Sequence, residues 1–176
     1  MVDWVLQENG QERQTVLDIG TGSGCIALAL QKSRPQWEVT GLDISKQALA
    51  VAMENEKRNH VPVRWQQKDI LHGTINEMYD IVVSNPPYII ESEKTSMKPN
   101  VLDYEPAKAL FVKDDNPLLF YRAIAEQKKG TKVYFEVNEK FARDVQRMLL
   151  TMDYKEVSIK QDMYGKARMV SGRIEG

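Results

Sequence analysis

Short apolar runs alternate with longer amphipathic stretches along most of this 176-residue chain. The apolar runs that fit buried strands occupy residues 15–20, 38–43, 61–68, 79–84 and 132–137. The stretches with helical spacing of apolar residues occupy residues 24–34, 45–59, 117–128 and 138–152. Strands alternating with amphipathic helices are typical of a mostly parallel α/β sheet. Two final strands, at residues 157–160 and 167–173, are predicted to form an antiparallel pair joined by a turn at Gly165.

The predicted fold is therefore α/β, a doubly wound seven-stranded, mostly parallel sheet with an antiparallel edge strand. Local signals set some of the boundaries. Pro35 must end the first helix, because proline cannot continue it. Ser45 and Asn138 are good N-caps, and Asn116 followed by Pro117 resembles an N-cap and first helical residue. Residues 85–116 show no clean periodicity, and a connection of this length in a small domain is usually functional.

Composition places the chain among ordinary globular domains. Hydrophobic residues make up 42% and charged residues 28%, and we predict a single domain over residues 1–176. Because 24 basic residues face 25 acidic ones, there is no basic surplus to indicate nucleic acid. The apolar runs are too short to span a bilayer, and the single cysteine, Cys25, fits a reducing compartment. We therefore expect a cytoplasmic protein with no membrane association, in which Cys25 is a small core residue.

The first informative motif is VLDIGTGSG at residues 16–24. Glycines 20, 22 and 24 lie between a predicted strand and helix, where a backbone without side chains can approach a ligand. The preceding Asp18 disfavours a pyrophosphate and favours a ligand with an ammonium group. Asp43 ends the next strand, in position to accept hydrogen bonds from ribose hydroxyls. Together these residues indicate S-adenosylmethionine, although a merely structural glycine turn is the alternative. Asp69 is a third candidate contact, near the adenine, and an ordinary loop acid is nearly as good an interpretation.

The second motif follows the strand at residues 79–84 and consists of Asn85, Pro86, Pro87 and Tyr88. Two prolines make this turn rigid and remove two backbone donors. The Asn85 carboxamide and the Pro86 carbonyl then form two neighbouring acceptors that suit a planar NH₂ group, and Tyr88 can pack against its flat face. We therefore predict that these residues hold a planar nitrogen at the carboxyl end of the sheet. A structural proline-rich turn is the alternative.

These motifs, in this order, resemble a class I S-adenosylmethionine-dependent methyltransferase, with a Rossmann-like methyltransferase fold. Residues 104–106 (YEP), 117–124 (PLLFYRAI) and 162–173 (DMYGKARMVSGR) are similar to the release-factor glutamine N5-methyltransferase family. That resemblance covers residues 2–173 and implies methylation of the glutamine in the Gly-Gly-Gln motif of peptide-chain release factors, with no metal. The catalytic residues it implies are Asn85, Pro86, Pro87 and Tyr88. The cofactor-binding residues it implies are Asp18, Gly20, Thr21, Gly22, Ser23, Gly24, Asp43, Asp69, Ile70 and Asn85.

Two departures and several alternatives accompany this assignment. The family usually begins with a helical docking domain, which we expect to be absent here. The family also tends to have a glycine shortly after the glutamate of its fifth strand, whereas here Glu136 is followed by Val137 and Asn138. The alternative substrates are the amino group of a nucleic-acid base (adenine N6 or guanine N2) and another protein glutamine. The other classes are a non-catalytic S-adenosylmethionine-binding module and, least favoured, a nicotinamide-dependent oxidoreductase.

Overall fold

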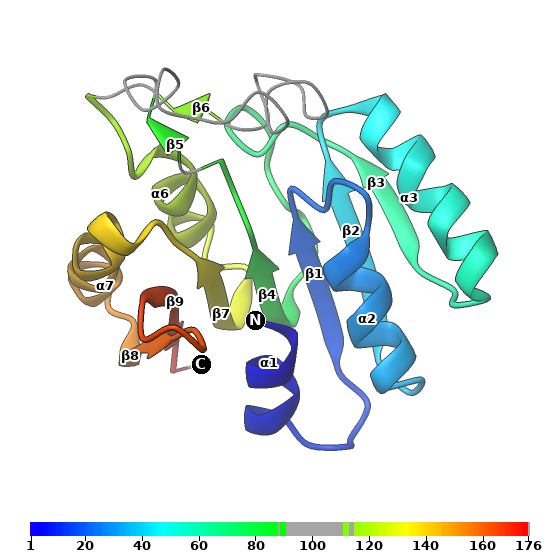
Figure 1. The fold of residues 1–176 in the computed structure, drawn as a ribbon, viewed down its shortest axis with the longest axis horizontal. Helices are drawn as coiled ribbons and strands as arrows, with labels where there is room; N and C mark the ends of the chain where they lie inside the picture. Colours follow the sequence, from blue (N-terminus) through cyan, green and yellow to red (C-terminus); the bar gives the residue numbers. More distant parts are fainter. Residues whose placement is uncertain (88, 91–110, 113–114, 176) are drawn as a thin grey trace.

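The computed structural model describes residues 1–87, 89–90, 111–112 and 115–175. Seven strands form one sheet in the order β3-β2-β1-β4-β7-β9-β8 (Figure 1). Neighbours from β3 to β7 pair in parallel, whereas β9 is antiparallel to both β7 and β8. The seven strands are β1 (Thr15–Ile19), β2 (Glu38–Asp43), β3 (Arg64–Gln67), β4 (Tyr79–Ser84), β7 (Gly130–Glu136), β8 (Lys155–Gln161) and β9 (Ala167–Arg173). The predicted fold class is therefore confirmed, with the antiparallel strand β9 one position in from the edge.

Helices cover both faces of the sheet (Figure 1). The helices are α1 (Val2–Glu8), α2 (Cys25–Ser33), α3 (Lys46–Asn59), α6 (Leu119–Glu126) and α7 (Ala142–Thr151), with a 3₁₀ turn, η2, at Glu139–Phe141. One apolar cluster joins α6 and α7 to one face of the sheet, and a second joins α1 and α2 to the other. Consecutive residues of β1 point to opposite clusters, Val16 to the second and Leu17 to the first. This alternation follows from the two-residue period of a strand.

Local signals predicted several boundaries correctly. Strands β2 and β4 have the predicted bounds, and α3 begins after Ser45, whose side chain accepts a hydrogen bond from the Ala48 N–H. The predicted third strand is shorter than expected, because Val61 and Val63 are buried without joining the ladder.

The predicted cap of α6 is wrong. This helix begins at Leu119 after a turn, and the Asn116 backbone carbonyl, rather than its side chain, accepts the Leu119 N–H. Asn138 caps η2 instead of opening α7 directly. Sequence reasoning missed α1, which buries Trp4 and Val5, and the short parallel pair of β5 (Ile89–Ile90) and β6 (Phe111–Val112). Among the described residues, no helix is long and apolar enough to cross a membrane.

Candidate functional site

The carboxyl ends of β1, β2 and β4 meet at one edge of the sheet. Ile19 pairs with Leu42 on one side and with Ser84 on the other. The Ser84 hydroxyl donates a 2.7 Å hydrogen bond to the Ile19 carbonyl, which ties the last residues of β4 and β1 together. Since the glycine loop follows β1, Asp43 ends β2 and Asn85 follows β4, the sheet register brings these predicted site residues to one place.

The glycine loop folds back onto β2. The backbone N–H groups of Gly20 and Thr21 both donate to the Leu42 carbonyl, at 2.8 and 3.0 Å. Gly22 and Gly24 have φ of +56° and +81°, a backbone region in which a side chain is strained. A Cβ added at Gly20 or Gly22 would meet nothing within 4 Å, whereas one at Gly24 would lie 2.7 Å from the Trp65 ring. The outer part of the loop therefore faces open space that a ligand can fill, and Gly24 is a packing position.

This difference predicts unequal effects of alanine at the two glycines. Gly24→Ala is expected to destabilise the fold by about 3 kcal/mol, the sum of a left-handed backbone and an overpacked contact. Gly22→Ala should cost only about 1 kcal/mol, for the backbone alone. Urea denaturation of both variants measures the difference, and equal losses of stability would show that the Trp65 contact is unimportant.

Asp18 is fully buried beneath this loop. Its Oδ2 accepts hydrogen bonds from the Thr21 hydroxyl at 2.6 Å and from the Ala27 N–H at 3.2 Å. Its Oδ1 is buried and has no hydrogen-bond partner among the described residues. Burial raises the pKa of this carboxyl from 3.8 to about 6, although the two hydrogen bonds oppose the shift. An orphaned carboxylate oxygen in a buried place fits an ammonium group of a ligand.

The raised pKa of Asp18 predicts a pH-dependent penalty on folding. The unfolded carboxyl ionises near pH 4, whereas the folded one keeps its proton up to about pH 6, so the folded state loses stability between these values. The free energy of unfolding of Asp18→Asn, minus that of the wild type, should therefore rise by about 2.4 kcal/mol from pH 4 to pH 7.

Denaturant titrations of both proteins across this range provide the measurement, and Asp69→Asn is the matched control. The Asp69 pKa is lowered, first by its hydrogen bond with His72, so its contribution to stability changes mainly below pH 4, and the difference for this control should stay nearly constant from pH 4 to pH 7. A pH-independent difference for Asp18→Asn would contradict the raised pKa.

Asp43 lies at the carboxyl end of β2 and organises two backbone segments. Its Oδ2 accepts the Gly22 N–H and its Oδ1 accepts the Ser45 N–H, both at 2.9 Å. Each carboxylate oxygen accepts about two hydrogen bonds, so these contacts leave capacity for ligand hydroxyls. The side chain is only half-buried, and both conditions fit the predicted contact with a ribose.

The segment after β3 lies beside Asp43, because the Lys68 N–H donates to the Asp43 carbonyl at 3.0 Å. Asp69 accepts the Leu71 N–H and contacts the His72 ring nitrogen, each at 2.8 Å. Ile70 is 9% exposed and packs in the apolar cluster beneath α6 and α7. A ligand role for Ile70 would therefore use its backbone, and the roles of both Asp69 and Ile70 stay predictions.

Asn85 is exposed directly beyond β4, Pro86 is buried and Pro87 is half-buried. The roles of Asn85, Pro86 and Pro87 at the site stay predictions. Tyr88 and residues 104–106 lie outside the described residues.

Cys25 is exposed at the start of α2, so the prediction of a core residue is wrong. Its first-turn position faces the loop instead of the sheet, and its thiol lies 3.1 Å from the Ser23 hydroxyl.

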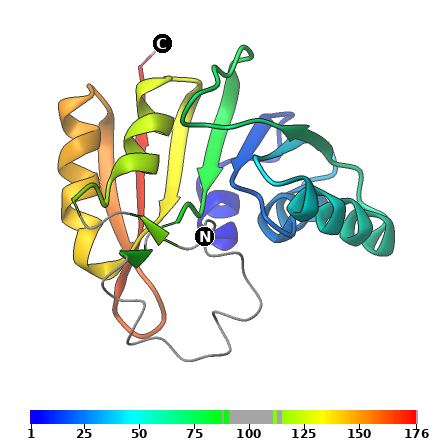
Figure 2. The same cartoon turned by 90° about the horizontal axis from the view of Figure 1, so that it is seen from above.

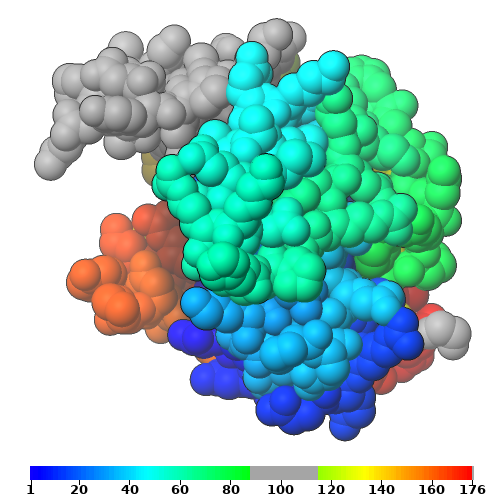
Figure 3. All heavy atoms as spheres, turned by 90° about the vertical axis from the view of Figure 1, so that its right-hand side faces the viewer, coloured from blue at the N-terminus to red at the C-terminus, as the bar shows by residue number. Residues whose placement is uncertain are grey.

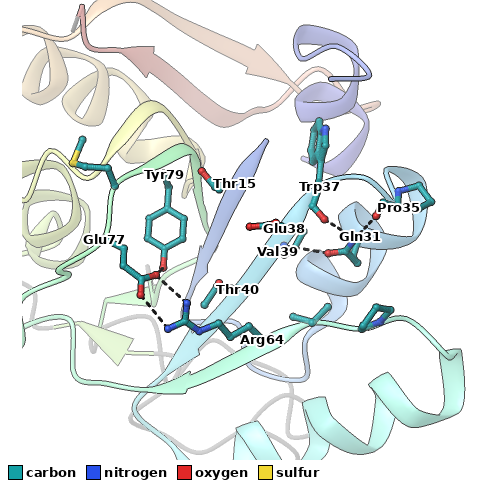
Figure 4. A pocket seen from close by; sticks show the side chains of 13 residues that line it. Thr15, Gln31, Pro35, Trp37, Glu38, Val39, Thr40, Arg64, Glu77 and Tyr79 are labelled. Atoms are coloured by element: carbon teal, nitrogen blue, oxygen red, sulfur yellow. Dashed lines mark hydrogen bonds and ion pairs between the residues drawn. The ribbon is translucent and has the colours of Figure 1, made fainter. Parts of the chain in front are cut away.

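A separate open pocket of about 550 Å³ lies at the opposite, amino edge of the sheet (Figure 4). Thr15, Glu38 and Tyr79, which begin β1, β2 and β4, line it. Its charged groups are already paired, since Arg64 pairs with Glu77 at 3.0 Å and Glu38 pairs with Arg13 from outside the pocket. Glu77 also accepts the Tyr79 hydroxyl at 2.9 Å. None of the predicted site residues lines this pocket, and we assign it no ligand.

Sequence reasoning overlooked four polar contacts that shape the site. The bonds from Thr21 and Ala27 to Asp18, and from Ser84 to Ile19, join the motif to its own helix and to the neighbouring strand. The Asn55 side chain also donates to the Ser23 carbonyl at 3.0 Å, which attaches the loop to α3. The recognised motif contains Asp18, Ile19, Thr21 and Ser23, whereas their partners Ala27, Asn55 and Ser84 are ordinary residues whose positions depend on the fold.

Comparison with known proteins places the chain among methyltransferases. The family model for the methyltransferase small domain matches residues 4–105. The release factor glutamine methyltransferase of Bacteroides thetaiotaomicron is 44% identical, over 97% of this chain and 64% of the relative. That of Flavobacterium psychrophilum is 40% identical, over 97% of this chain and 63% of the relative. The chain thus spans less than two thirds of the length of these relatives.

A solved structure of a methyltransferase from Pyrococcus furiosus is similar in fold, with a TM-score of 0.70. It is 19% identical to this chain and is matched over 97% of this chain and 80% of its own. The Rossmann-like methyltransferase fold that the motifs indicated is therefore confirmed.

Proposed function

This chain belongs to the methyltransferase small domain family, and from that premise we propose that it transfers a methyl group from S-adenosylmethionine to a glutamine side chain. The acceptor is the amide nitrogen of the glutamine in the Gly-Gly-Gln motif of a peptide-chain release factor. Relatives at 40–44% identity named as release factor glutamine methyltransferases support this substrate. Because release factors act on ribosomes, the proposed location is the cytoplasm.

The observation that carries the proposal is that Asp18, the glycine loop, Asp43 and Asn85 lie together at the carboxyl ends of β1, β2 and β4. Asp18 Oδ1, which has no hydrogen-bond partner among the described residues, suits the ammonium group of the cofactor. The half-buried Asp43 suits its ribose hydroxyls. The open space over Gly20 and Gly22 accommodates the part between them. When bound, S-adenosylmethionine supplies a methyl group on a positively charged sulfur.

The residues after β4 position the acceptor. The Asn85 carboxamide oxygen and the Pro86 carbonyl each accept one N–H of the glutamine NH₂ group. An amide nitrogen is a poor nucleophile, because its lone pair is delocalised into the carbonyl. Two fixed acceptors align this nitrogen and stabilise the positive charge that develops on it as the new bond forms. The alkylated amide is strongly acidic, so its proton leaves without a strong general base.

Mass spectrometry of a release factor incubated with the chain and isotopically labelled S-adenosylmethionine tests the proposal. A labelled methyl group is expected on the Gly-Gly-Gln glutamine and absent from a control factor in which this glutamine is glutamate. A parallel reaction with DNA and RNA examines the amino groups of adenine and guanine. Methylation of nucleic acid alone would overturn the assignment of a protein substrate.

A further inference from the structure

The tip of the β8–β9 hairpin carries two large apolar side chains that nothing in the described chain covers. Met163 is 89% exposed and Tyr164 is 80% exposed, the highest values among the large hydrophobic residues of the described chain. In the space-filling view the hairpin stands out from the body of the molecule (Figure 3). Burying such side chains against a partner is favourable, and exposed apolar groups in a cluster mark interaction sites.

The backbone of this tip is rigidly held. Asp162 Oδ1 accepts the N–H groups of Tyr164 and Lys166, at 2.9 and 3.0 Å. The Gly165 N–H donates to the Asp162 carbonyl at 3.0 Å, and the Asp162 N–H donates to the Lys166 carbonyl at 2.8 Å. Gly165 has a φ of +76° that completes the turn. Because the turn is already ordered, binding through Met163 and Tyr164 loses little backbone entropy.

The hairpin projects from the same edge of the sheet as the candidate site. Strand β9 runs antiparallel to β7, and the Val137 N–H, just beyond β7, donates to the Arg168 carbonyl. The tip therefore extends past the carboxyl end of β7, as Figure 2 shows. Strand β7 is itself the neighbour of β4, which Asn85 follows. Strand spacing and rise place the tip about 15–20 Å from Asn85, whereas a standard protein interface extends over roughly 30 Å.

We propose that Met163 and Tyr164 form a docking contact for the body of the protein whose glutamine enters the site at Asn85. This inference rests on the proposed function and adds where the protein substrate is held. Methionine and tyrosine are both enriched in protein interfaces. The basic residues of the tip are less suited to phosphates, because Lys166 pairs with Glu139 at 3.5 Å and Arg168 with Asp162 at 3.7 Å. The occupant is therefore a folded protein rather than a nucleic acid.

Steady-state kinetics of a double variant, Met163→Gln with Tyr164→Gln, tests the docking contact. Two acceptors are compared, an intact release factor and a short peptide that contains Gly-Gly-Gln. The double variant should raise KM for the intact factor about tenfold or more, the loss typical of removing an interface anchor. Its kcat, its kinetics with the peptide and its affinity for S-adenosylmethionine should stay unchanged. The matched control is Met78→Gln, because Met78 is 63% exposed at the opposite edge, just before β4.

The outcomes separate the docking contact from the proposed function. If the wild-type chain methylates the factor and the double variant keeps the same KM, the docking contact is wrong and the proposed function stands. If the double variant instead loses affinity for single-stranded RNA while its KM for the factor is unchanged, the tip binds nucleic acid and the docking contact is also wrong. A wild-type chain that methylates neither acceptor would overturn the proposed function, and the docking contact with it.

Discussion

Replacement of Asn85 by alanine is expected to lower the single-turnover rate of methyl transfer by about 10²–10³-fold, the scale for removing one preorganised transition-state hydrogen bond. Because Asn85 is exposed, its loss should change the free energy of unfolding by less than about 0.5 kcal/mol. Cofactor affinity should remain largely intact, since the lost contact is to the acceptor nitrogen. Rate, melting temperature and affinity are measured on one sample.

Two further variants make the Asn85 test specific. Asn85→Asp keeps an acceptor oxygen and should retain more activity than the alanine variant. Asn59→Ala removes an exposed asparagine at the end of α3, whose side chain donates to the Asn55 carbonyl, and should leave the rate unchanged. Near-normal turnover by a stably folded Asn85→Ala protein would end the hypothesis that Asn85 holds the nitrogen. A loss of rate that only follows the unfolded fraction would indicate a structural role instead.

Asp43→Ala is expected to weaken binding of S-adenosylmethionine by about 10²-fold. Two ribose hydroxyls would lose a charged acceptor, at about 1.5 kcal/mol for each bond. The Gly22 and Ser45 N–H groups would also lose their acceptor, so the glycine loop should become less well ordered. Isothermal titration calorimetry at a temperature where both proteins are folded measures the affinity.

Asp80→Ala is the matched control for Asp43. Asp80 also accepts two hydrogen bonds, from the N–H and the hydroxyl of Thr15, but it lies near the amino end of β4. Its replacement should lower stability without changing cofactor affinity. Equal affinity losses in the two variants would mean that Asp43 acts only through general stability, and unchanged affinity in Asp43→Ala would remove this residue from the site.

Much of the candidate site was visible in the sequence because its signals are short-range. The spacing of Gly20, Gly22 and Gly24 and the prolines after Asn85 restrict the backbone wherever they occur. The sequence also predicted that Asp18 would be near a ligand. It did not predict that Oδ1 is buried with no partner in the described part of the chain, or that the pKa is raised, because desolvation depends on how the rest of the chain packs around the carboxyl.

The sequence by itself determined the fold class, the bounds of β2, β4 and α3, and the order of the motifs. Apolar periodicity and helix caps involve residues close together in the chain, so they can be read without the fold. Only the tertiary structure decided that β9 inserts between β7 and β8, that Cys25 is exposed, and that Met163 and Tyr164 project beside the site edge. Strand order and exposure arise from contacts between distant segments, and no local pattern specifies which of these segments become neighbours.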